Sequence, residues 1–292
     1  MVIEEKQGYA KMNLCRQGIW VANLGGVWYD KKQETDLVRK DRRPKMQFHE
    51  FGDNGNPALL VMHGMLCDWR KFREIFMPLE QDFHVIYPAM NGCYDGAPDF
   101  KSFAEECSEI ERWLIEHHDG RLDAAVGVSQ GATLMVILAS RHIVSIDKAI
   151  LDGVYVAHQG KLCADLALKA FLRMQKNGGT PSKAFIKALP LMGLDESDLD
   201  EFKLMYWGGS RESMKANLIE NYTYRVPADF RIEATKVFLW CGSKEPYAKK
   251  SHEILKKHIA DCEERIFDGF GHGQKMIRDT ADYLNEIRKA LL

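Results

Sequence analysis

The sequence predicts a mostly parallel, doubly wound α/β sheet with a helical insertion. Short apolar runs of strand length recur between residues 46 and 267, and helix-like stretches separate them. Strands that alternate with helices are typical of parallel sheets covered on both faces. The alternation breaks at 157–232, where helical stretches follow one another without a strand. We therefore expect 46–156 and 233–292 to form the α/β core, with 157–232 as a cap above the sheet.

The expected strands are short, mostly apolar runs bounded by turn residues, except that 46–51 roughly alternates apolar and polar residues. A wholly apolar run is typical of a parallel strand buried on both faces. One run is expected to end at Pro88, because proline cannot donate a ladder hydrogen bond. The expected strands are Met46–Phe51, Ala58–Met62, Phe83–Tyr87, Ala124–Val128, Lys148–Val156, Lys236–Cys241 and Glu264–Phe267.

The expected helices fill the spaces between these strands and the whole of the insertion. In the core, a capping-box pattern at 102–105 begins one helix, and 132–139 forms another. In the insertion we expect helices over 162–175, 181–188 and 197–206, and a fourth over 211–222. Aromatic side chains there are candidates for a pocket lining, although packing within the cap explains them equally well: Phe171, Phe185, Phe202, Tyr206, Trp207, Tyr222 and Tyr224.

Residues 1–45 differ from the rest because they show no sustained period of 2 or 3.6. One interpretation is a flexible or loosely docked extension. The other is a translated leader before a native start at Met46, since codons for the preceding Asp-Arg-Arg-Pro-Lys can form a purine-rich ribosome-binding sequence. Peptides from residues 1–45 in the natively expressed protein would contradict the leader.

The composition excludes several functional classes. The 292 residues include 40 Lys and Arg against 42 Asp and Glu, a net charge of −2, which gives no electrostatic case for nucleic acid or an anionic membrane. The longest apolar run, 132–139, is too short to span a bilayer. Seven cysteines without a CxxC pair fit reduced thiols in the cytoplasm. No HExxH, CxxC or Walker-type loop is present, so we expect neither a metal nor a cofactor.

The strongest chemical signal is the GxSxG pattern at residues 127–131. An apolar strand precedes it and an apolar helix follows, which is the strand–turn–helix setting of a nucleophile elbow rather than of an ordinary glycine-rich turn. The sharp turn strains the serine backbone and lifts its hydroxyl out of the sheet, while Gly127 and Gly131 avoid clashes in the bend. We predict that Ser129 is a nucleophile.

A serine nucleophile needs a histidine base to take its proton. His272 lies in the glycine-rich loop 269–273, directly after the last apolar run, where it could reach the carboxyl edge of the sheet. The other histidines considered are interpreted as strand residues or as solvated residues on helices: His84, His117, His118, His252 and His258.

An acid must then orient the histidine. Glu245 is the preferred candidate, because its loop follows the strand Val237–Cys241. Asp152, at the end of another apolar run, and Asp268, close to His272 in sequence, are the alternatives. A surface salt bridge is the purely structural interpretation of Glu245.

With Ser129, Glu245 and His272 in this chain order, the sequence from about Met46 to Leu292 resembles the α/β-hydrolase superfamily. The resemblance rests on the turn at 63–64, the GxSxG elbow, the acid loop and the Gly-His-Gly loop. Residues 91–96 are similar to the family's polar loop but lack its usual Gly-x-Gly-x-Ser.

The resemblance implies an oxyanion hole formed by the backbone N–H groups of Gln130 and Met65, with His63 holding the loop of Met65. Two features depart from the family pattern. The acid is Glu where the family more often has Asp. The loop reads His-Gly-Met-Leu rather than HGGG, which disfavours a lipase for large esters.

Together these features predict a serine hydrolase that cleaves a small ester or related acyl bond through an acyl-enzyme. Its partner is a small-molecule acyl substrate. A C–C bond hydrolase, a thioesterase or an acyltransferase would use the same residues, because a fold does not choose among these reactions. A non-catalytic ligand-binding protein is the alternative from another class.

Overall fold

A computed structural model of the chain describes residues 2–3, 12–15, 18–22, 28–30, 46–177, 180–200, 205 and 209–292. The chain divides into two units, Met1–Pro44 and Lys45–Leu292. In the first unit, the described residues form a four-stranded antiparallel sheet in the order β1-β2-β3-β4. Its strands are β1 (Val2–Ile3), β2 (Met12–Cys15), β3 (Gly18–Ala22) and β4 (Trp28–Asp30). The rest of the predicted extension or leader lies outside the described residues.

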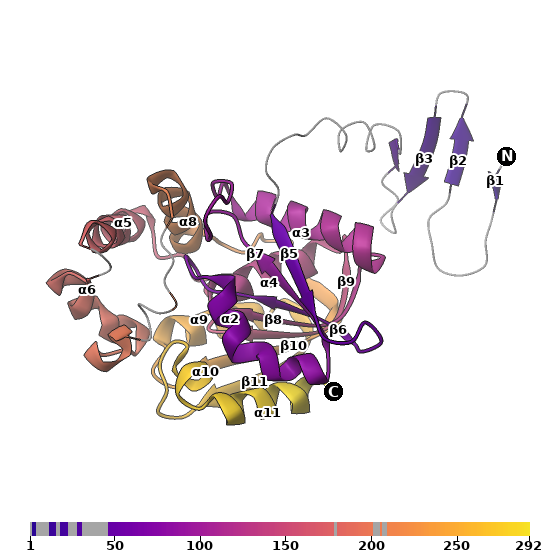
Figure 1. Cartoon of the computed structure of the whole chain (residues 1–292). Coiled ribbons are helices and arrows are strands. Elements are labelled where there is room, and N and C mark those ends of the chain that lie inside the picture. Colours follow the sequence, from indigo (N-terminus) through magenta and orange to yellow (C-terminus); the bar gives the residue numbers. More distant parts are fainter. Residues whose placement is uncertain are drawn as a thin grey trace. The chain divides into compact units, whose positions relative to one another are not determined.

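The second unit is built on a seven-stranded sheet in the order β11-β10-β9-β8-β6-β7-β5 (Figure 1). Only the edge strand β5 runs antiparallel, to its neighbour β7, and the other pairs are parallel. This arrangement confirms the predicted fold class. The strands are β5 (Gln47–Phe51), β6 (Ala58–Met62), β7 (His84–Ala89), β8 (Arg121–Val128), β9 (Ser145–Asp152), β10 (Ile232–Gly242) and β11 (Ile259–Phe267).

Helices cover both faces of this sheet. Apolar residues of α3, α4 and α9 form one buried cluster with the strands, and those of α2, α10 and α11 form a second on the opposite face. Two apolar layers explain why the central strands are apolar on both sides. The helices are α2 (Trp69–Phe76), α3 (Phe103–His118), α4 (Gln130–Arg141), α9 (Pro246–Leu255), α10 (Gln274–Arg278) and α11 (Thr280–Leu291), with a 3₁₀ turn η1 (Met77–Gln81) after α2.

The described part of the insertion 157–232 carries the helices α5, α6 and α8, which lie together beyond one end of the sheet (Figure 1), and its last residue, Ile232, begins β10. A third apolar cluster contains Phe171, Phe185 and Tyr222 together with Leu66 of the core. Three of the candidate pocket aromatics, Phe202, Tyr206 and Trp207, lie outside the described residues. The elements of the insertion are α5 (Lys161–Lys176), α6 (Lys183–Ala188), η2 (Leu189–Met192), η3 (Glu196–Asp198) and α8 (Arg211–Thr223).

Several predicted boundaries were wrong. Strand β7 continues through Pro88 to Ala89, because its pairing with β6 ends at Ile86 and Pro88 faces only the edge strand β5. Strand β9 ends at Asp152 rather than at residue 156, since Gly153 turns the chain with φ of +61°. In the predicted helix 197–206, the described residues are helical: they belong to the short turn η3 up to Asp198 and to α-helix at 199–200 and at 205.

The histidine of α9 was also wrongly placed by its sequence pattern. His252 does not lie on a polar surface: it is fully buried, and its Nδ1 lies 2.9 Å from Oε1 of Glu264 on β11. His258, which was predicted to lie in the same helical stretch, lies beyond the end of α9 at Leu255.

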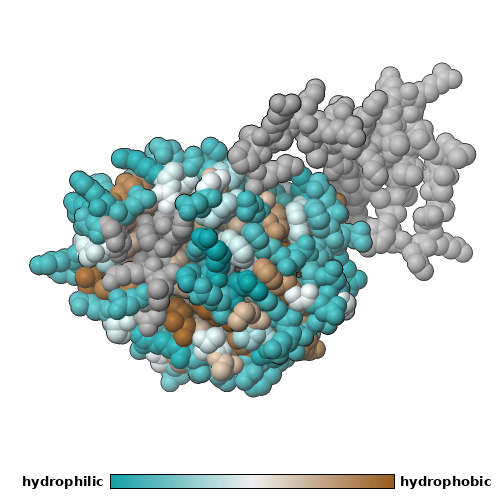
Figure 2. Space-filling model, in the orientation of Figure 1, coloured by the Kyte–Doolittle hydropathy of each residue, from teal (hydrophilic) through white to brown (hydrophobic). Residues whose placement is uncertain are grey.

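Figure 2 shows a mostly hydrophilic face of the α/β unit, with hydrophobic residues scattered over it. None of the helices that the structure describes is both long enough and apolar enough to cross a membrane.

Candidate active site

The GxSxG pattern forms a tight turn between β8 and α4. Ser129 adopts φ 57° and ψ −115°, in a backbone region that costs a non-glycine residue about 1–3 kcal/mol. A Cβ atom on Gly131 would lie 2.3 Å from the carbonyl oxygen of Met62, and one on Gly127 would lie 2.5 Å from that of Gly131. Both glycines are therefore required by close backbone contacts that hold the strained serine in place.

The structure brings the three predicted catalytic side chains together. Nε2 of His272 lies 2.9 Å from Oγ of Ser129, and Nδ1 lies 2.6 Å from Oε2 of Glu245. When Nδ1 donates its proton to the carboxylate, Nε2 is left to accept the serine proton. The residues come from three loops at the carboxyl ends of β8, β10 and β11, which lie close together in the sheet.

Glu245 is held by its second oxygen as well. Its Oε1 accepts a hydrogen bond of 2.7 Å from the backbone N–H of Gly242, and only 1% of the residue is exposed. Because Glu245 is buried, the interpretation of this residue as part of a surface salt bridge does not hold. Asp268, one of the alternative acids, is exposed, and the described contacts of the His272 ring nitrogens are to Ser129 and Glu245.

Asp152, the other alternative acid, lies beside the hydrogen-bonded relay of Ser129, His272 and Glu245 without bonding to the histidine. Its Oδ2 accepts a hydrogen bond of 2.8 Å from the Tyr283 hydroxyl, and its backbone carbonyl accepts one from the Ser129 amide, also 2.8 Å. Burial and the neighbouring Glu245 carboxylate raise the pKa of Asp152 to about 7, although the Tyr283 hydrogen bond opposes this. Asp152 therefore helps to position the elbow.

The electrostatic surroundings favour the cationic form of His272. Burial by itself would lower its pKa, but the charge and hydrogen bond of Glu245, with a contribution from Asp152, raise the pKa above its usual value. An imidazole of this kind is a stronger base toward a serine hydroxyl.

This shift predicts the pH dependence of ester hydrolysis, the activity that the sequence predicts. Protonated His272 cannot accept the Ser129 proton, so kcat/KM for an ester should rise along an acid limb with its midpoint above about 6.5, the ordinary histidine value. Asp152→Asn should move this midpoint downward, because it removes one carboxylate that stabilises the cation. A wild-type midpoint at or below 6.5 would contradict the expectation.

The two expected oxyanion donors flank the nucleophile. Gln130 is the first residue of α4, so its N–H has no acceptor within the helix. The turn that carries Met65 is closed by a hydrogen bond of 3.3 Å from the Cys67 amide to the Gly64 carbonyl. A Cβ on Gly64 would lie 3.6 Å from Cβ of Ser129, so this turn runs directly beside the serine.

His63 holds that turn through both of its ring nitrogens. Its Nδ1 lies 2.9 Å from the Gly64 carbonyl oxygen, and Nε2 lies 3.4 Å from the Met90 amide. Burial lowers the pKa of His63 to about 4, against the opposing effect of the Gly64 contact, so the ring is neutral at pH 7. A neutral ring can donate to the carbonyl and accept from the amide at once.

Two supporting residues were missed in the sequence. Gly153 allows His272 to approach: a Cβ there would lie 2.7 Å from Cε1 of the imidazole, and its φ of +61° also favours glycine. Asn221 of α8 donates a hydrogen bond of 3.2 Å from Nδ2 to Oε1 of Gln130, which links the insertion to the elbow. The roles of Gly153 and Asn221 depend on tertiary contacts, and neither residue belongs to a local motif that would indicate its role in the sequence.

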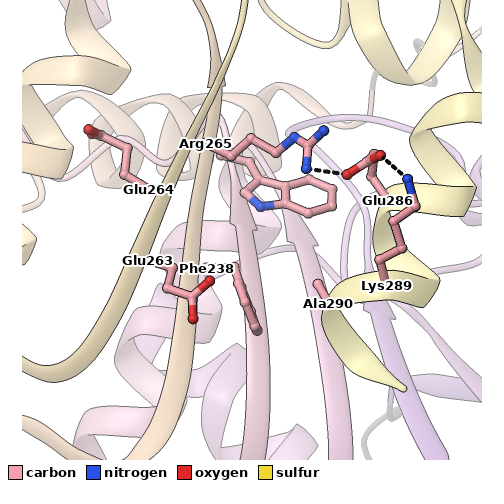
Figure 3. A pocket seen from close by; sticks show the side chains of 8 residues that line it. Phe238, Glu263, Glu264, Arg265, Glu286, Lys289 and Ala290 are labelled. Atoms are coloured by element: carbon pink, nitrogen blue, oxygen red, sulfur yellow. Dashed lines mark hydrogen bonds and ion pairs between the residues drawn. The ribbon is translucent and has the colours of Figure 1, made fainter.

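A separate hollow of about 260 Å³ lies between β10, β11 and α11 (Figure 3). Of its lining residues, Glu286 forms ion pairs with Arg265 and Lys289, while Glu263 and Glu264 pair with Lys236 and Lys256 outside the lining. None of the three relay residues lines this hollow.

No family model and no curated protein sequence matches the chain. Its structure is similar to an α/β-hydrolase family protein from Desulfitobacterium hafniense, with 22% identity and a TM-score of 0.74 over 84% of this chain and 100% of that one. It is also similar to a carboxylesterase structure from Nitrososphaera gargenis, with 19% identity and a TM-score of 0.65 over 84% and 94% of the two chains. A lipase-esterase related protein from Clostridium acetobutylicum matches with 17% identity and a TM-score of 0.64, over 85% and 100%. All three share the fold of this chain.

Proposed function

Because the chain has the fold of the α/β-hydrolase superfamily, we propose that it is a serine hydrolase that cleaves a small carboxylic ester through an acyl-enzyme. The observation that carries the proposal is the continuous hydrogen-bonded relay from Ser129 through His272 to the buried Glu245. The esterases among the structural neighbours support the same reaction class.

In the first half of the reaction, Oγ of Ser129 attacks the ester carbonyl while Nε2 of His272 takes the serine proton. The imidazolium then protonates the leaving alkoxide, and the acyl group stays on the serine. In the second half, His272 activates a water molecule that releases the acid and restores the serine. Throughout, Glu245 fixes the tautomer of the ring and stabilises its cation.

The backbone N–H groups of Gln130 and Met65 are proposed to bind the oxyanion of each tetrahedral intermediate. Loss of one such donor costs about 10²–10³ in kcat. Asn221 and His63 act through these donors as positioning residues, because they hold the Gln130 side chain and the turn at Gly64.

The proposed substrate carries a short apolar acyl group. Met65 and Leu66 pack with Phe171 and Phe185 of the insertion, so the expected oxyanion turn is continuous with apolar side chains of the proposed cap. Six cysteines whose side chains the structure describes are free, which supports the proposal of a reducing compartment such as the cytoplasm.

The test combines covalent labelling with substrate profiling. A fluorophosphonate should label the wild-type protein, and mass spectrometry should place the adduct on Ser129, because the probe reacts only with an activated serine. Among p-nitrophenyl esters, acetate and butyrate should be hydrolysed faster than palmitate. Absence of labelling would favour the ligand-binding alternative, and a preference for long chains would contradict the small-ester substrate. Product analysis with added alcohols or thiols separates hydrolysis from acyl transfer.

A further inference from the structure

A second cluster of chemically competent side chains lies away from the serine. Oε2 of Glu50 is 2.6 Å from Nε2 of His84 and 3.1 Å from Nε2 of His118. The ligand atoms of the three residues all lie within 4.8 Å of one another. Nδ1 of His84 is buried and has no hydrogen-bond partner among the described residues, so Nε2 is the ring atom that the fold directs at a polar group.

The sheet and one helix bring these three residues together. Glu50 of β5 pairs with Ile86 of β7, so His84, two residues before Ile86, is its diagonal neighbour on the same face. Helix α3 covers this face, because Trp113 stacks on Phe48 of β5 with ring centroids 4.3 Å apart. His118 is the last residue of α3, where the partial negative charge of a helix C-terminus favours a cation.

We propose that Glu50, His84 and His118 bind one Zn²⁺ ion, with water in the fourth position. Two imidazole nitrogens and one carboxylate are a known zinc ligand set, and imidazole ligands do not suit Mg²⁺ or Ca²⁺. At Zn–N and Zn–O distances of about 2.0–2.2 Å, the ligand atoms of a tetrahedral site lie about 3.3–3.5 Å apart. The two contacts of Glu50 are shorter than this spacing by less than about 1 Å, and the two histidine nitrogens, within 4.8 Å of each other, need to approach by at most about 1.5 Å.

The exposure of the ligands leaves a path for the ion. The His84 side chain is 7% exposed and that of His118 is 15% exposed, whereas Glu50 is 36% exposed. The histidines are therefore held by the fold while the carboxylate faces water, where the fourth ligand belongs.

The position of the cluster separates the proposed ion from the serine and its histidine. His84 is the first residue of β7, whereas Ser129 follows the last residue of the parallel strand β8. The two sites thus lie at opposite ends of the parallel strands. The ion would join the outermost strand β5 to β7 and α3. Sequence motifs could not indicate it, because each ligand is 34 residues from the next, too far for a local motif.

The test uses the full-length protein with Zn²⁺ as the probe, in competition with a chromophoric zinc chelator. Wild type should bind one equivalent, and its Tm should rise by about 5 °C or more when free Zn²⁺ reaches 100 times Kd. His118→Gln and Glu50→Gln should weaken binding by more than the roughly 10- to 100-fold that loss of an outer-shell partner costs. His117→Gln is the matched control, since this exposed residue precedes His118 in the same helix and is not in the cluster.

Ester hydrolysis should be unchanged in His118→Gln, because the residue does not contact the serine relay. The proposal is overturned if wild type binds no Zn²⁺, or if His118→Gln binds it as tightly as wild type. The second result would assign the ion to other groups, such as the free thiols. A Mg²⁺ stabilisation equal to that of Zn²⁺ would also contradict it.

Discussion

Ser129→Ala should reduce kcat for p-nitrophenyl acetate by about 10⁴- to 10⁶-fold and abolish fluorophosphonate labelling. The substitution removes the nucleophile, so no acyl-enzyme can form, and the remaining rate reflects only the oxyanion donors and substrate binding. Steady-state hydrolysis and intact-protein mass spectrometry measure the two effects directly.

The loss should occur without a loss of folding. The Ser129 side chain makes no capping hydrogen bond to α4, and alanine at φ 57° is strained in the same way as serine. The Tm of the variant should therefore stay close to that of wild type. Ser108→Ala is a matched control, because this half-buried hydroxyl of α3 donates to the Ala104 carbonyl and accepts from Arg141, away from Ser129. Turnover by Ser129→Ala close to that of wild type would contradict a serine mechanism.

The parts of the fold that sequence predicts well are those encoded over a few neighbouring residues. The GxSxG turn requires small residues because two backbone segments meet there, and an apolar run on each side identifies the strand and helix. The strand cores of β6 and β8 are wholly apolar because helices cover both faces. Because both lie in short glycine-rich motifs that follow apolar runs, Ser129 and the loop of His272 can be predicted as site candidates from the amino-acid sequence alone.

What escaped prediction depends on partners far away in the chain. His252 resembles a surface residue of an amphipathic helix, but Glu264 on β11 supplies a carboxylate that compensates its burial. His118 resembles a helix-terminal surface residue, and the packing of α3 on β5 places Glu50 beside it. Asn221 reaches Gln130 through the packing of the insertion. Such pairings follow from tertiary geometry, which local periodicity does not encode.

The role of Glu245 as the acid can be tested by a single substitution. Glu245→Gln keeps the size of the side chain but removes its charge. Because the Gly242 amide donates to one end of the group, the glutamine should turn its oxygen toward Gly242 and its NH₂ toward Nδ1 of His272. The ring must then carry its proton on Nε2, which is the tautomer that cannot accept from Ser129. By analogy with the corresponding change in serine proteases, kcat should fall by about 10⁴-fold.

Asp152→Asn is the matched control for this change, since it also converts a buried carboxyl to an amide next to the relay. Its oxygen can still accept from the Tyr283 hydroxyl, and the backbone bond from Asp152 to Ser129 is untouched. We expect its kcat at alkaline pH to stay within about tenfold of wild type, in the range of one lost neutral interaction. The opposite result, with Asp152→Asn inactive and Glu245→Gln active, would transfer the role of acid to Asp152. Loss of activity in both variants with retained Tm would show that the imidazolium needs both carboxyl groups. The pair of amide variants therefore separates the residue that orients His272 from the one that only contributes to its electrostatic environment.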